Sequence, residues 1–490
     1  MSSAQRSQPE SSRPAQPRIA AAAPASSVLD MIGNTPMIRL GSFDVGPCTL
    51  LVKLENQNPA GSIKDRIGRS MIEAAEREGK IKAGGTLVEA TAGNTGLGLA
   101  LVAARKGYKL ILVVPDKMSR EKILHLRALG AQIVLTRSDV AKGHPAYYQD
   151  YAERITRETP GAFYVNQFNN PANPLAHETT TGPEIWQQTG GKLDAVVCGV
   201  GSGGTISGLS WFFAKVAPNV EMVLADPAGS VLADYVKTGK MGTAGSWLVE
   251  GIGEDFIPSI ADLSRVRHAF SITDAESLNT SRQLLRDEGI LAGSSSGTLV
   301  AAAVRYCRQQ TAPKTVVTFV CDTGGKYLSK LFDDTWMSEQ GFGARAETRD
   351  LRDLIGRPAT EGVLVSLAPD DPVKIAYNRM RAYDVSQLPV LDAQGRLAGI
   401  VDESDLLLAA LRSDDAFDRP VGDVMTAKVQ TIDPHASIDD LLPIFDSGLV
   451  PVVADSKGFY GLITRVDVLN FLRRQHAGHP ALRNHKTAGQ

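Results

Sequence analysis

Short apolar runs with strand character alternate with segments of helical periodicity over residues 28–342. Leu110–Val114 and Thr315–Val320 have the length and β-branched content of buried strands, whereas Arg66–Glu78 and Ala275–Glu288 repeat their apolar residues with the period of a helix. Strands and helices in alternation predict parallel sheets with helices on both faces. About 315 residues exceed what one hydrophobic core usually serves, so we expect an α/β region of two lobes with a cleft between them.

An internal repeat follows in the C-terminal part of the chain. The nineteen residues from Pro389 read PVLDAQGRLAGIVDESDLL, and those from Pro451 read PVVADSKGFYGLITRVDVL, an offset of 451 − 389 = 62 residues. Five of the nineteen positions are identical, among them Asp405 and Asp467. The repeat predicts two copies of a small α+β unit with the order β-α-β-β-α, packed face to face. The alternative is two unrelated hairpins with similar turns.

Composition helps to divide the chain into parts. The first residues are rich in Ser, Ala, Pro and Arg and contain almost no large apolar side chains, a composition that cannot bury enough surface to offset the entropy cost of ordering. We therefore expect a disordered tail (1–27), the large α/β region (28–342), a linker (343–360), the first repeat copy (361–415), the second repeat copy (416–475) and a flexible tail (476–490).

Charge and cysteine usage exclude several classes of partner. Lysine and arginine number 52 and aspartate and glutamate 54, so the formal charge is 52 − 54 = −2. A chain without a basic field is a poor candidate for nucleic-acid binding, and no apolar run approaches the ~20 residues that span a bilayer. Four scattered cysteines, none in a C-x-x-C pair, predict reduced thiols and a cytoplasmic location. Only His476 and His479 are spaced like metal ligands, and because they lie in the tail we expect no metal centre.

Lys64 is the first residue suited to cofactor chemistry. It follows a Gly-Ser turn within NPAGSIKDR (58–66), at the start of a predicted helix. The positive end of a helix and partial desolvation both lower the pKa of an amine, which suits it to Schiff-base formation. Taken alone, Lys64 is more simply interpreted as a surface residue.

Two glycine-containing turns provide candidate anion sites. Backbone N–H groups can converge on an anion where a helix begins, as in TAGNTG (91–96) and GVGSGGTISG (199–208). The first is also typical of an ordinary strand-to-helix turn, and the second lacks both the dinucleotide spacing and the P-loop lysine. Residues 293–297 form a further cluster of small and hydroxyl residues. A lysine for an aldehyde and a glycine-rich helix start for a phosphate together suggest pyridoxal phosphate.

The order and number of these motifs give a resemblance to a known family. From about Ser27 to Phe342 the chain resembles the β-replacing pyridoxal-phosphate enzymes of fold type II, among them the cystathionine β-synthases. The repeat resembles a pair of CBS domains and extends the likeness to about Arg474. The implied fold is a two-lobed α/β core followed by tandem α+β CBS domains. The motifs that carry the resemblance are IGNTP (32–36), GSIKDR (61–66), TAGNTG (91–96), NPANPLAH (170–177), GSGGT (201–205), VEGIGEDFIP (249–258) and AGSSSG (292–297).

The resemblance implies a role for each matching residue. Lys64 is the expected catalytic and Schiff-base lysine, Asn94 the partner of the cofactor's ring oxygen, and Ser295 the serine that faces the ring nitrogen. The expected phosphate cradle consists of Gly201, Ser202, Gly203, Gly204 and Thr205. Contacts to the substrate carboxylate are expected from Thr91, Thr95 and Gln167, and part of the second-substrate wall from Glu250 and Gly251.

The implied reaction condenses L-serine with L-homocysteine to cystathionine, as in reverse transsulfuration, with hydrogen sulfide production from cysteine as an additional activity. Lys64 would exchange for the substrate's amino group, remove the α-proton as general base and return to release the product. A neutral hydroxyl at Ser295 leaves the ring nitrogen largely unprotonated, which favours β-elimination over transamination.

Three departures from the family pattern keep alternatives open. Ala92 stands where the family usually has Ser, Phe168 where animal enzymes have Tyr and cysteine synthases often have Phe, and Glu254 where animal enzymes have another Tyr. The alternative enzyme is a cysteine synthase that uses O-acetylserine or serine with sulfide, although VEGIGEDF favours homocysteine. A different class of alternative is an adenosyl-ligand sensor with a vestigial catalytic lobe, against which Lys64 and the intact phosphate loop argue.

Animal members of the family hold a haem near the N-terminus through Cys and His. Residues 1–47 contain neither Cys nor His, so we expect no haem.

The repeat predicts a regulatory ligand. Thr464 and Asp467 match the ribose-binding motif of CBS domains, whose carboxylate accepts both ribose hydroxyls. In the first copy Asp402 replaces the threonine beside Asp405, and two acids there would repel a phosphorylated ligand. We therefore expect S-adenosylmethionine, whose sulfonium is cationic; the alternative is a structural or dimerising module without a ligand. The resemblance also implies a homodimer or a higher homo-oligomer.

Overall fold

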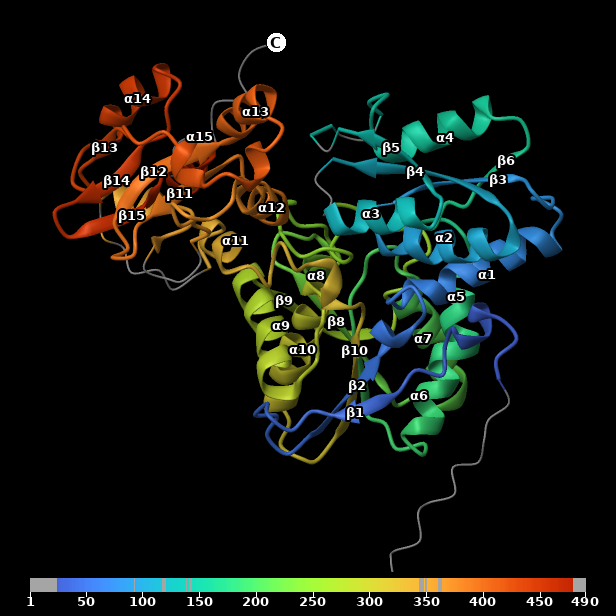
Figure 1. Cartoon of the computed structure of the whole chain (residues 1–490). Coiled ribbons are helices and arrows are strands. Elements are labelled where there is room, and N and C mark those ends of the chain that lie inside the picture. Colours follow the sequence, from blue (N-terminus) through green and yellow to red (C-terminus); the bar gives the residue numbers. More distant parts are fainter. Residues whose placement is uncertain are drawn as a thin grey trace, which may run out of the picture. The chain divides into compact units, whose positions relative to one another are not determined.

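The structure, a computed structural model, describes residues 24–91, 93–116, 120–137, 139–140, 143–342, 348, 350–359 and 364–478. The described residues form two compact units, which are divided between Tyr327 and Leu328 (Figure 1). The predicted Ala92 departure, most of the N-terminal tail and the end of the C-terminal tail with His479 lie outside the described residues.

The described residues of the first unit form two sheets. The larger has six strands in the order β1 (Met37–Arg39), β2 (Thr49–Leu54), β10 (Thr315–Val320), β7 (Ala195–Cys198), β8 (Glu221–Pro227) and β9 (Val266–Ile272). Neighbouring strands in this sheet are parallel, except that β1 is antiparallel to β2. The smaller sheet is entirely parallel, in the order β5 (Gln132–Thr136), β4 (Lys109–Pro115), β3 (Thr86–Ala90) and β6 (Ala162–Tyr164). Two parallel-type sheets confirm the predicted two-lobed α/β class.

Helices flank both sheets (Figure 1). Successive β3 residues pack on opposite faces, because Leu87 lies in the cluster that includes α1 and α2 residues, whereas Val88 and Ala90 lie in the cluster that includes α4 residues. The helices of this unit are α1 (Lys64–Arg77), α2 (Asn94–Lys106), α3 (Arg120–Ala128), α4 (Tyr148–Glu158), α5 (Ala172–Ala176), α6 (Gly182–Gln188), α7 (Gly204–Val216), α8 (Leu232–Thr238), α9 (Asp274–Glu288) and α10 (Ser294–Arg308). Short helical turns are η1 (Val28–Met31), η2 (Glu55–Gln57), η3 (His177–Thr181) and η4 (Gly324–Lys326).

Close packing of α1 on α2 fixes where α1 begins. A Cβ atom on Gly98 would lie 2.5 Å from the Lys64 carbonyl oxygen, and one on Gly68 would lie 2.6 Å from the Gly98 carbonyl carbon. Only glycines at these two positions allow the helices to approach this closely. The crossing therefore sets the position of Lys64, the first residue of α1.

The second unit contains the repeat. Its first copy holds α12 (Val373–Tyr383), α13 (Glu403–Arg412) and the antiparallel pair β11 (Gln387–Leu391) and β12 (Leu397–Asp402). The second copy holds a sheet of β13 (Thr431–Ile432), β14 (Val452–Asp455) and β15 (Gly458–Leu462), with the helices α14 (Leu442–Asp446) and α15 (Arg465–Gly478). The remaining elements are α11 (Asp334–Glu339), η5 (Leu351–Leu354), η7 (Ala416–Asp418), η8 (Val421–Asp423) and η9 (Ile438–Leu441).

Part of the predicted linker belongs to a folded core. Leu351, Leu354 and Ile355 are buried in one cluster with residues of the second copy, including Ile432 and Val453. The Leu351 N–H donates to the Pro434 carbonyl at 2.8 Å. Residues that precede the first copy in the chain thus pack with the second copy.

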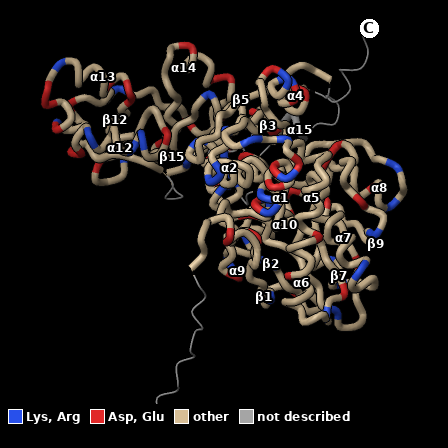
Figure 2. The backbone as a smooth tube through the Cα atoms, turned by 90° about the vertical axis from the view of Figure 1, so that its right-hand side faces the viewer, with Lys and Arg blue, Asp and Glu red and all other residues tan. Residues whose placement is uncertain are grey.

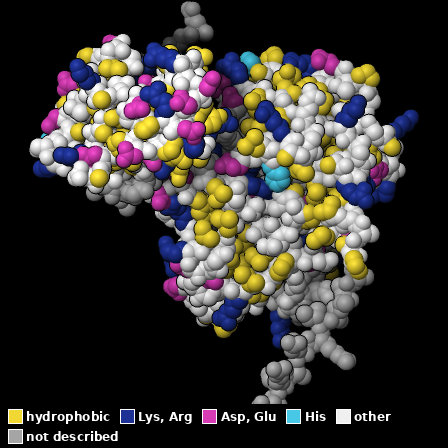
Figure 3. Space-filling view, viewed as in Figure 1, with side chains coloured by type: hydrophobic (Ala, Val, Ile, Leu, Met, Phe, Trp, Pro, Cys, Tyr) yellow, Lys and Arg dark blue, Asp and Glu magenta, His cyan; other side chains and the backbone are white. Residues whose placement is uncertain are grey.

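Charge is distributed without a dominant sign. Basic and acidic residues are interspersed along the backbone in Figure 2, and charged side chains of both signs lie among apolar ones on the face in Figure 3. Within the described ranges, no helix is long and apolar enough to cross a membrane.

Candidate active site

Lys64 lies where α1 meets the chain that follows β10. The Ile63 N–H donates to the Cys321 carbonyl at 2.9 Å, and Ser62 forms an isolated bridge with Asp322. Burial lowers the pKa of the Lys64 amine, while the acidic groups of Asp322 and Glu254 act in the opposite direction. The Lys64 backbone N–H donates to Ser62 Oγ at 3.2 Å, and no described residue accepts a hydrogen bond from the side-chain amine.

The glycine positions of the loop after β7 have no room for a side chain. A Cβ on Gly204 would lie 1.8 Å from Asn173 Oδ1, and one on Gly201 would lie 2.6 Å from the Gly251 carbonyl oxygen. Gly203 has a φ of 91°, a left-handed conformation that favours glycine. The first backbone N–H groups of α7 have no acceptor within the helix, so the loop fits an anion such as a phosphate.

Polar side chains surround this loop. Asn173 donates from Nδ2 to Ser202 Oγ at 2.9 Å and to the Gln167 carbonyl at 2.8 Å. His177, to which the sequence analysis assigned no role, is fully buried and lies 3.0 Å from Thr181 Oγ1 through Nδ1 and 3.2 Å from Thr205 Oγ1 through Nε2. Burial lowers the pKa of His177 well below its usual value, so the ring is neutral at physiological pH. Its place at the end of NPANPLAH was the signal available in the sequence.

Two of the predicted substrate contacts are joined directly. Thr95 donates to Gln167 Oε1 at 2.6 Å, and Gln167 Nε2 donates to the Ala90 carbonyl at 3.4 Å. Thr91, also buried, accepts from the Gly93 N–H at 3.3 Å. The buried carboxyl group of Glu89 accepts from the Gln167 backbone N–H at 3.3 Å. The start of α2 and the turn after β6 therefore form one polar wall.

Asn94 takes part in a chain of hydrogen bonds that the sequence analysis did not predict. Its Nδ2 donates to Asp322 Oδ2 at 2.7 Å, and its Oδ1 accepts from Lys326 Nζ at 2.8 Å. Tyr327 donates its hydroxyl hydrogen to Asp322 Oδ2 at 2.7 Å. Lys122 then donates to the Tyr327 hydroxyl at 3.0 Å.

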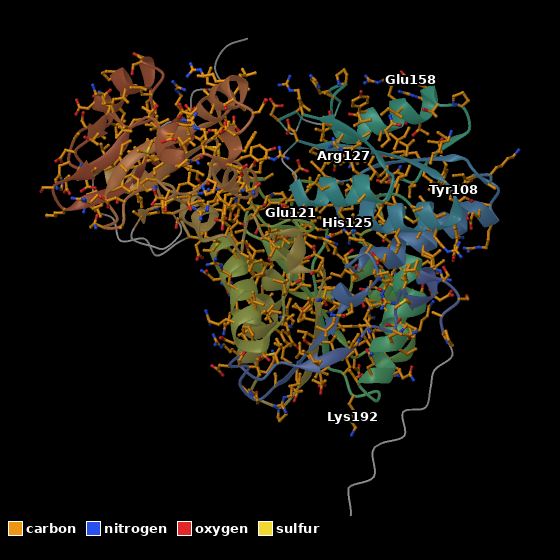
Figure 4. The ribbon with its side chains drawn as sticks, viewed as in Figure 1. Tyr108, Glu121, His125, Arg127, Glu158 and Lys192 are labelled. Atoms are coloured by element: carbon orange, nitrogen blue, oxygen red, sulfur yellow. The ribbon has the colours of Figure 1, made fainter. Side chains whose placement is uncertain are left out.

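The predicted second-substrate wall joins the same chain of contacts. Glu250 pairs with Lys122 at 2.6 Å, and its backbone N–H donates to Ser294 Oγ at 3.1 Å. Gly251 contacts the glycine-rich loop through its carbonyl oxygen. Lys122 belongs to α3, where Figure 4 labels His125, whose pKa is lowered by burial and by the charge of Lys326. This face of α3 therefore lies beside the candidate site.

Ser295 lies in the first turn of α10 and is buried. Ser296 Oγ accepts from the Cys321 N–H at 2.9 Å, which joins this turn to the chain that follows β10. Burial raises the pKa of Cys321 to about 12, so the group is a neutral thiol. Ser295 and Cys321 therefore place no negative charge at this part of the site.

In the second unit, Thr464 and Asp467 contact each other. Thr464 donates to Asp467 Oδ2 from its hydroxyl at 2.6 Å and from its backbone N–H at 2.7 Å. In return, the Asp467 backbone N–H donates to Thr464 Oγ1 at 3.2 Å, which caps the start of α15. In the first copy, Asp402 and Asp405 make the equivalent capping box. The carboxylate of Asp467 also lies against Gly356, whose Cβ would stand 2.5 Å from Oδ1.

The sequence matches two families. The pyridoxal-phosphate dependent enzyme family matches residues 28–322, and the CBS domain matches residues 358–412 and 421–474. The chain is 34% identical over 468 residues to a cystathionine beta-synthase of Dictyostelium discoideum, covering 91% of this chain and 92% of that one. It is 42% identical over 317 residues to a cysteine synthase of Staphylococcus aureus, covering 64% of this chain and 99% of that one.

A solved structure shares the fold of the first unit. The O-acetylserine dependent cystathionine beta-synthase from Helicobacter pylori superposes with a TM-score of 0.58 at 34% identity, covering 63% of this chain and 99% of that one. These matches confirm the predicted resemblance.

Proposed function

Because the chain belongs to the cystathionine β-synthase and cysteine synthase family of pyridoxal-phosphate-dependent enzymes and has a tandem pair of CBS domains, we propose that it condenses L-serine with L-homocysteine to cystathionine. The enzyme class follows from the family, and the choice of these two substrates is the proposal. It rests on the similarity to cystathionine beta-synthases along 91% of the chain and on the VEGIGEDF segment beside the glycine-rich loop.

One observation favours Lys64 as the reacting amine. A second lysine, Lys326, lies in the same site, and burial lowers its pKa to about 8. The three N–H groups of Lys326 donate to the carbonyls of Ala60 and Gly61 and to Asn94 Oδ1, at 3.0, 3.2 and 2.8 Å. No described residue accepts from the side-chain amine of Lys64, so Lys64 is the lysine that can attack a carbonyl group.

The residues present fit the cofactor. When bound, pyridoxal phosphate supplies an aldehyde for an amine and a ring that withdraws electrons from the substrate's α-carbon. The loop from Gly201 to Thr205 would hold its phosphate, and Asn94 would donate to its ring oxygen. The neutral Ser295 hydroxyl would face the ring nitrogen without placing a negative charge there.

The protein's own residues would then direct the proton transfers. The depressed pKa of Lys64 leaves more of its amine unprotonated at neutral pH, the form that removes the α-proton. Thr91, Thr95 and Gln167 would bind the substrate carboxylate and hold the α-carbon above Lys64. Glu250, fixed by Lys122, would form the wall against which the thiol substrate lies.

Reduction and mapping would test this assignment. We expect cofactor-supplemented protein to be coloured, and borohydride reduction followed by peptide mapping to place one pyridoxyl group on Lys64. Lys53→Met, which removes another buried lysine, should not change the labelled position. A label on Lys326, or no label, would contradict the proposed role of Lys64.

A cysteine synthase activity is the second candidate, favoured by the 42% identity to the Staphylococcus aureus enzyme. Initial rates with serine or O-acetylserine, each paired with homocysteine or sulfide, would separate the two functions. We expect the highest kcat/KM with serine and homocysteine. A higher value with sulfide would assign the chain to cysteine synthesis.

We also propose that the CBS pair binds S-adenosylmethionine through Thr464 and Asp467. Calorimetric titration of the full chain should detect binding that Asp467→Asn abolishes. Asp405→Asn disturbs the equivalent helix cap in the first copy and is the matched control, for which binding should remain. Equal loss in both variants would indicate a structural effect, and no binding to the unmodified chain would leave a module without this ligand.

A further inference from the structure

The Asn94 carboxamide is held between two groups of opposite charge. Lys326 Nζ donates to Oδ1 at 2.8 Å, and Nδ2 donates to Asp322 Oδ2 at 2.7 Å. Lys326 and Asp322 both belong to the segment that follows β10, and Lys326 ends η4. Asn94 begins α2, which follows a strand of the other sheet.

This pair of partners allows only one direction of the amide. A lysine ammonium has donors only, and an ionised carboxylate has acceptors only. If the amide turned over, its NH2 group would face the ammonium and its oxygen would face the carboxylate, so both charge-assisted bonds would become repulsive contacts. In the observed direction, one of the two Nδ2 hydrogens binds Asp322 and the other is free to donate.

Both partners are themselves held in place. Lys326 is 4% exposed and donates to the Ala60 and Gly61 carbonyls, directly before the turn that leads to Lys64. Asp322 is fully buried and accepts from the Tyr327 hydroxyl at 2.7 Å. Their positions are therefore set by the fold and not by Asn94.

We propose that Lys326 and Asp322 are positioning residues that fix the direction of the Asn94 carboxamide, so that its NH2 group faces the cofactor's ring oxygen. The inference rests on the proposed function, because it concerns the residue expected to contact that oxygen. Neither residue touches the cofactor in this proposal. Each acts through Asn94.

Spectroscopy of the cofactor-loaded protein provides the test. The balance between the long-wavelength absorption bands of the lysine-bound cofactor depends on the proton at the ring oxygen, which a hydrogen-bond donor stabilises or displaces. We expect Lys326→Met to change the ratio of these bands by about twofold or more and to weaken cofactor binding by about tenfold. Lys326→Arg keeps the donors and should restore most of the parent ratio.

A second variant and a control make the result decisive. Asp322→Asn gives Asn94 a partner that both donates and accepts, so that either direction of the Asn94 amide is allowed. The band ratio should therefore move in the same direction as in Lys326→Met. The two variants test the same point, so one of them suffices if the other folds poorly. Lys53→Met removes a buried lysine that contacts Thr35, Gln188 and Glu184, and it should keep the parent ratio whatever its stability.

An unchanged ratio in Lys326→Met and Asp322→Asn would overturn the inference and leave the proposed function intact. An equal change in Lys53→Met would also overturn it, because the effect would then be general destabilisation. If the unmodified chain shows no cofactor band, the proposed function fails and this inference fails with it.

Discussion

Glu89 is a buried carboxyl group with one unpaired oxygen atom among the described residues. It lies in β3 with its side chain fully buried, and no described residue donates to its Oε1. Its Oε2 accepts from the Gln167 backbone N–H at 3.3 Å. Burial raises the pKa of Glu89 to about 8, although neighbouring backbone N–H groups oppose the shift. The folded protein therefore keeps this carboxyl group protonated at neutral pH.

The raised pKa makes folding stability depend on pH. An unfolded glutamate titrates near 4.5, so between pH 4.5 and about 8 the native state binds a proton that the unfolded state releases. The contribution is full below pH 4.5 and is lost as pH rises toward 8. The slope approaches about 1.4 kcal/mol per pH unit, so raising the pH from 5 to 7 should lower the free energy of unfolding by about 2 to 3 kcal/mol through this one group.

Glu89→Gln removes the titration while keeping the shape of the side chain. We will compare the free energies of unfolding of the parent and the variant in urea, followed by tryptophan fluorescence at pH 5, 6 and 7. Between pH 5 and pH 7, the free energy of unfolding of the parent should fall by about 2 kcal/mol or more relative to that of the variant. Trp186, Trp211 and Trp247 lie in the first unit, so the signal reports mainly on that unit.

The control is Glu78→Gln, which removes an exposed carboxylate at the end of α1 and should leave the pH dependence of the parent unchanged. If the free energies of unfolding of the parent and Glu89→Gln change equally with pH, the reasoning is refuted. A constant difference between them would then mean that the hydrogen bond to Gln167 contributes to stability and the bound proton does not.

Three further substitutions test the geometry of the site. Gly98→Ala pushes a methyl group to 2.5 Å from the Lys64 carbonyl oxygen; it should cost about 1–3 kcal/mol in urea unfolding and lower kcat, whereas an unchanged kcat would mean that the crossing does not position Lys64. Gly204→Ala fills the space beside Asn173 Oδ1 and should weaken cofactor binding by about tenfold in equilibrium dialysis, with retention of full affinity contradicting the predicted cradle. His177→Phe removes the ring nitrogen beside Thr205 and should raise the cofactor's dissociation constant more than it changes kcat at saturation; the reverse pattern would argue against a role at the phosphate.

The sheets and their helices could be predicted from the sequence because parallel strands are buried on both faces. Runs such as Leu110–Val114 and Thr315–Val320 are continuous apolar segments, and they form β4 and β10 as expected. Lys64 and the glycine-rich loop could be found because each lies in a short motif that combines turn residues with a helix start. These signals are local, so a single sequence contains them.

The partners of Asn94 could not be predicted, because they are distant in the chain. Asp322 is 228 residues away and Lys326 is 232 residues away. Neither residue forms a recognisable motif with Asn94. Their proximity requires the start of α2 and the end of β10 to meet, which depends on how the two sheets pack. The same holds for Glu89, whose raised pKa reflects burial that its sequence neighbours do not reveal.

The segment before the first CBS copy shows a further limit of sequence reasoning. Leu351, Leu354 and Ile355 have the i, i+3, i+4 spacing of one helical face, so their sequence predicts burial as much as it predicts a linker. The sequence does not say against which copy they pack, because both copies offer similar apolar positions. In the structure, Ile355 packs directly against Gly461 of the second copy. A Cβ atom on Gly461 would lie 2.4 Å from Ile355 Cγ2, so this contact requires a glycine. The corresponding Gly399 instead faces Met425 and Thr426, which lie near the start of the second copy. Equivalent glycines of the repeat therefore accommodate different chain segments, and the segment before the first copy packs with the second.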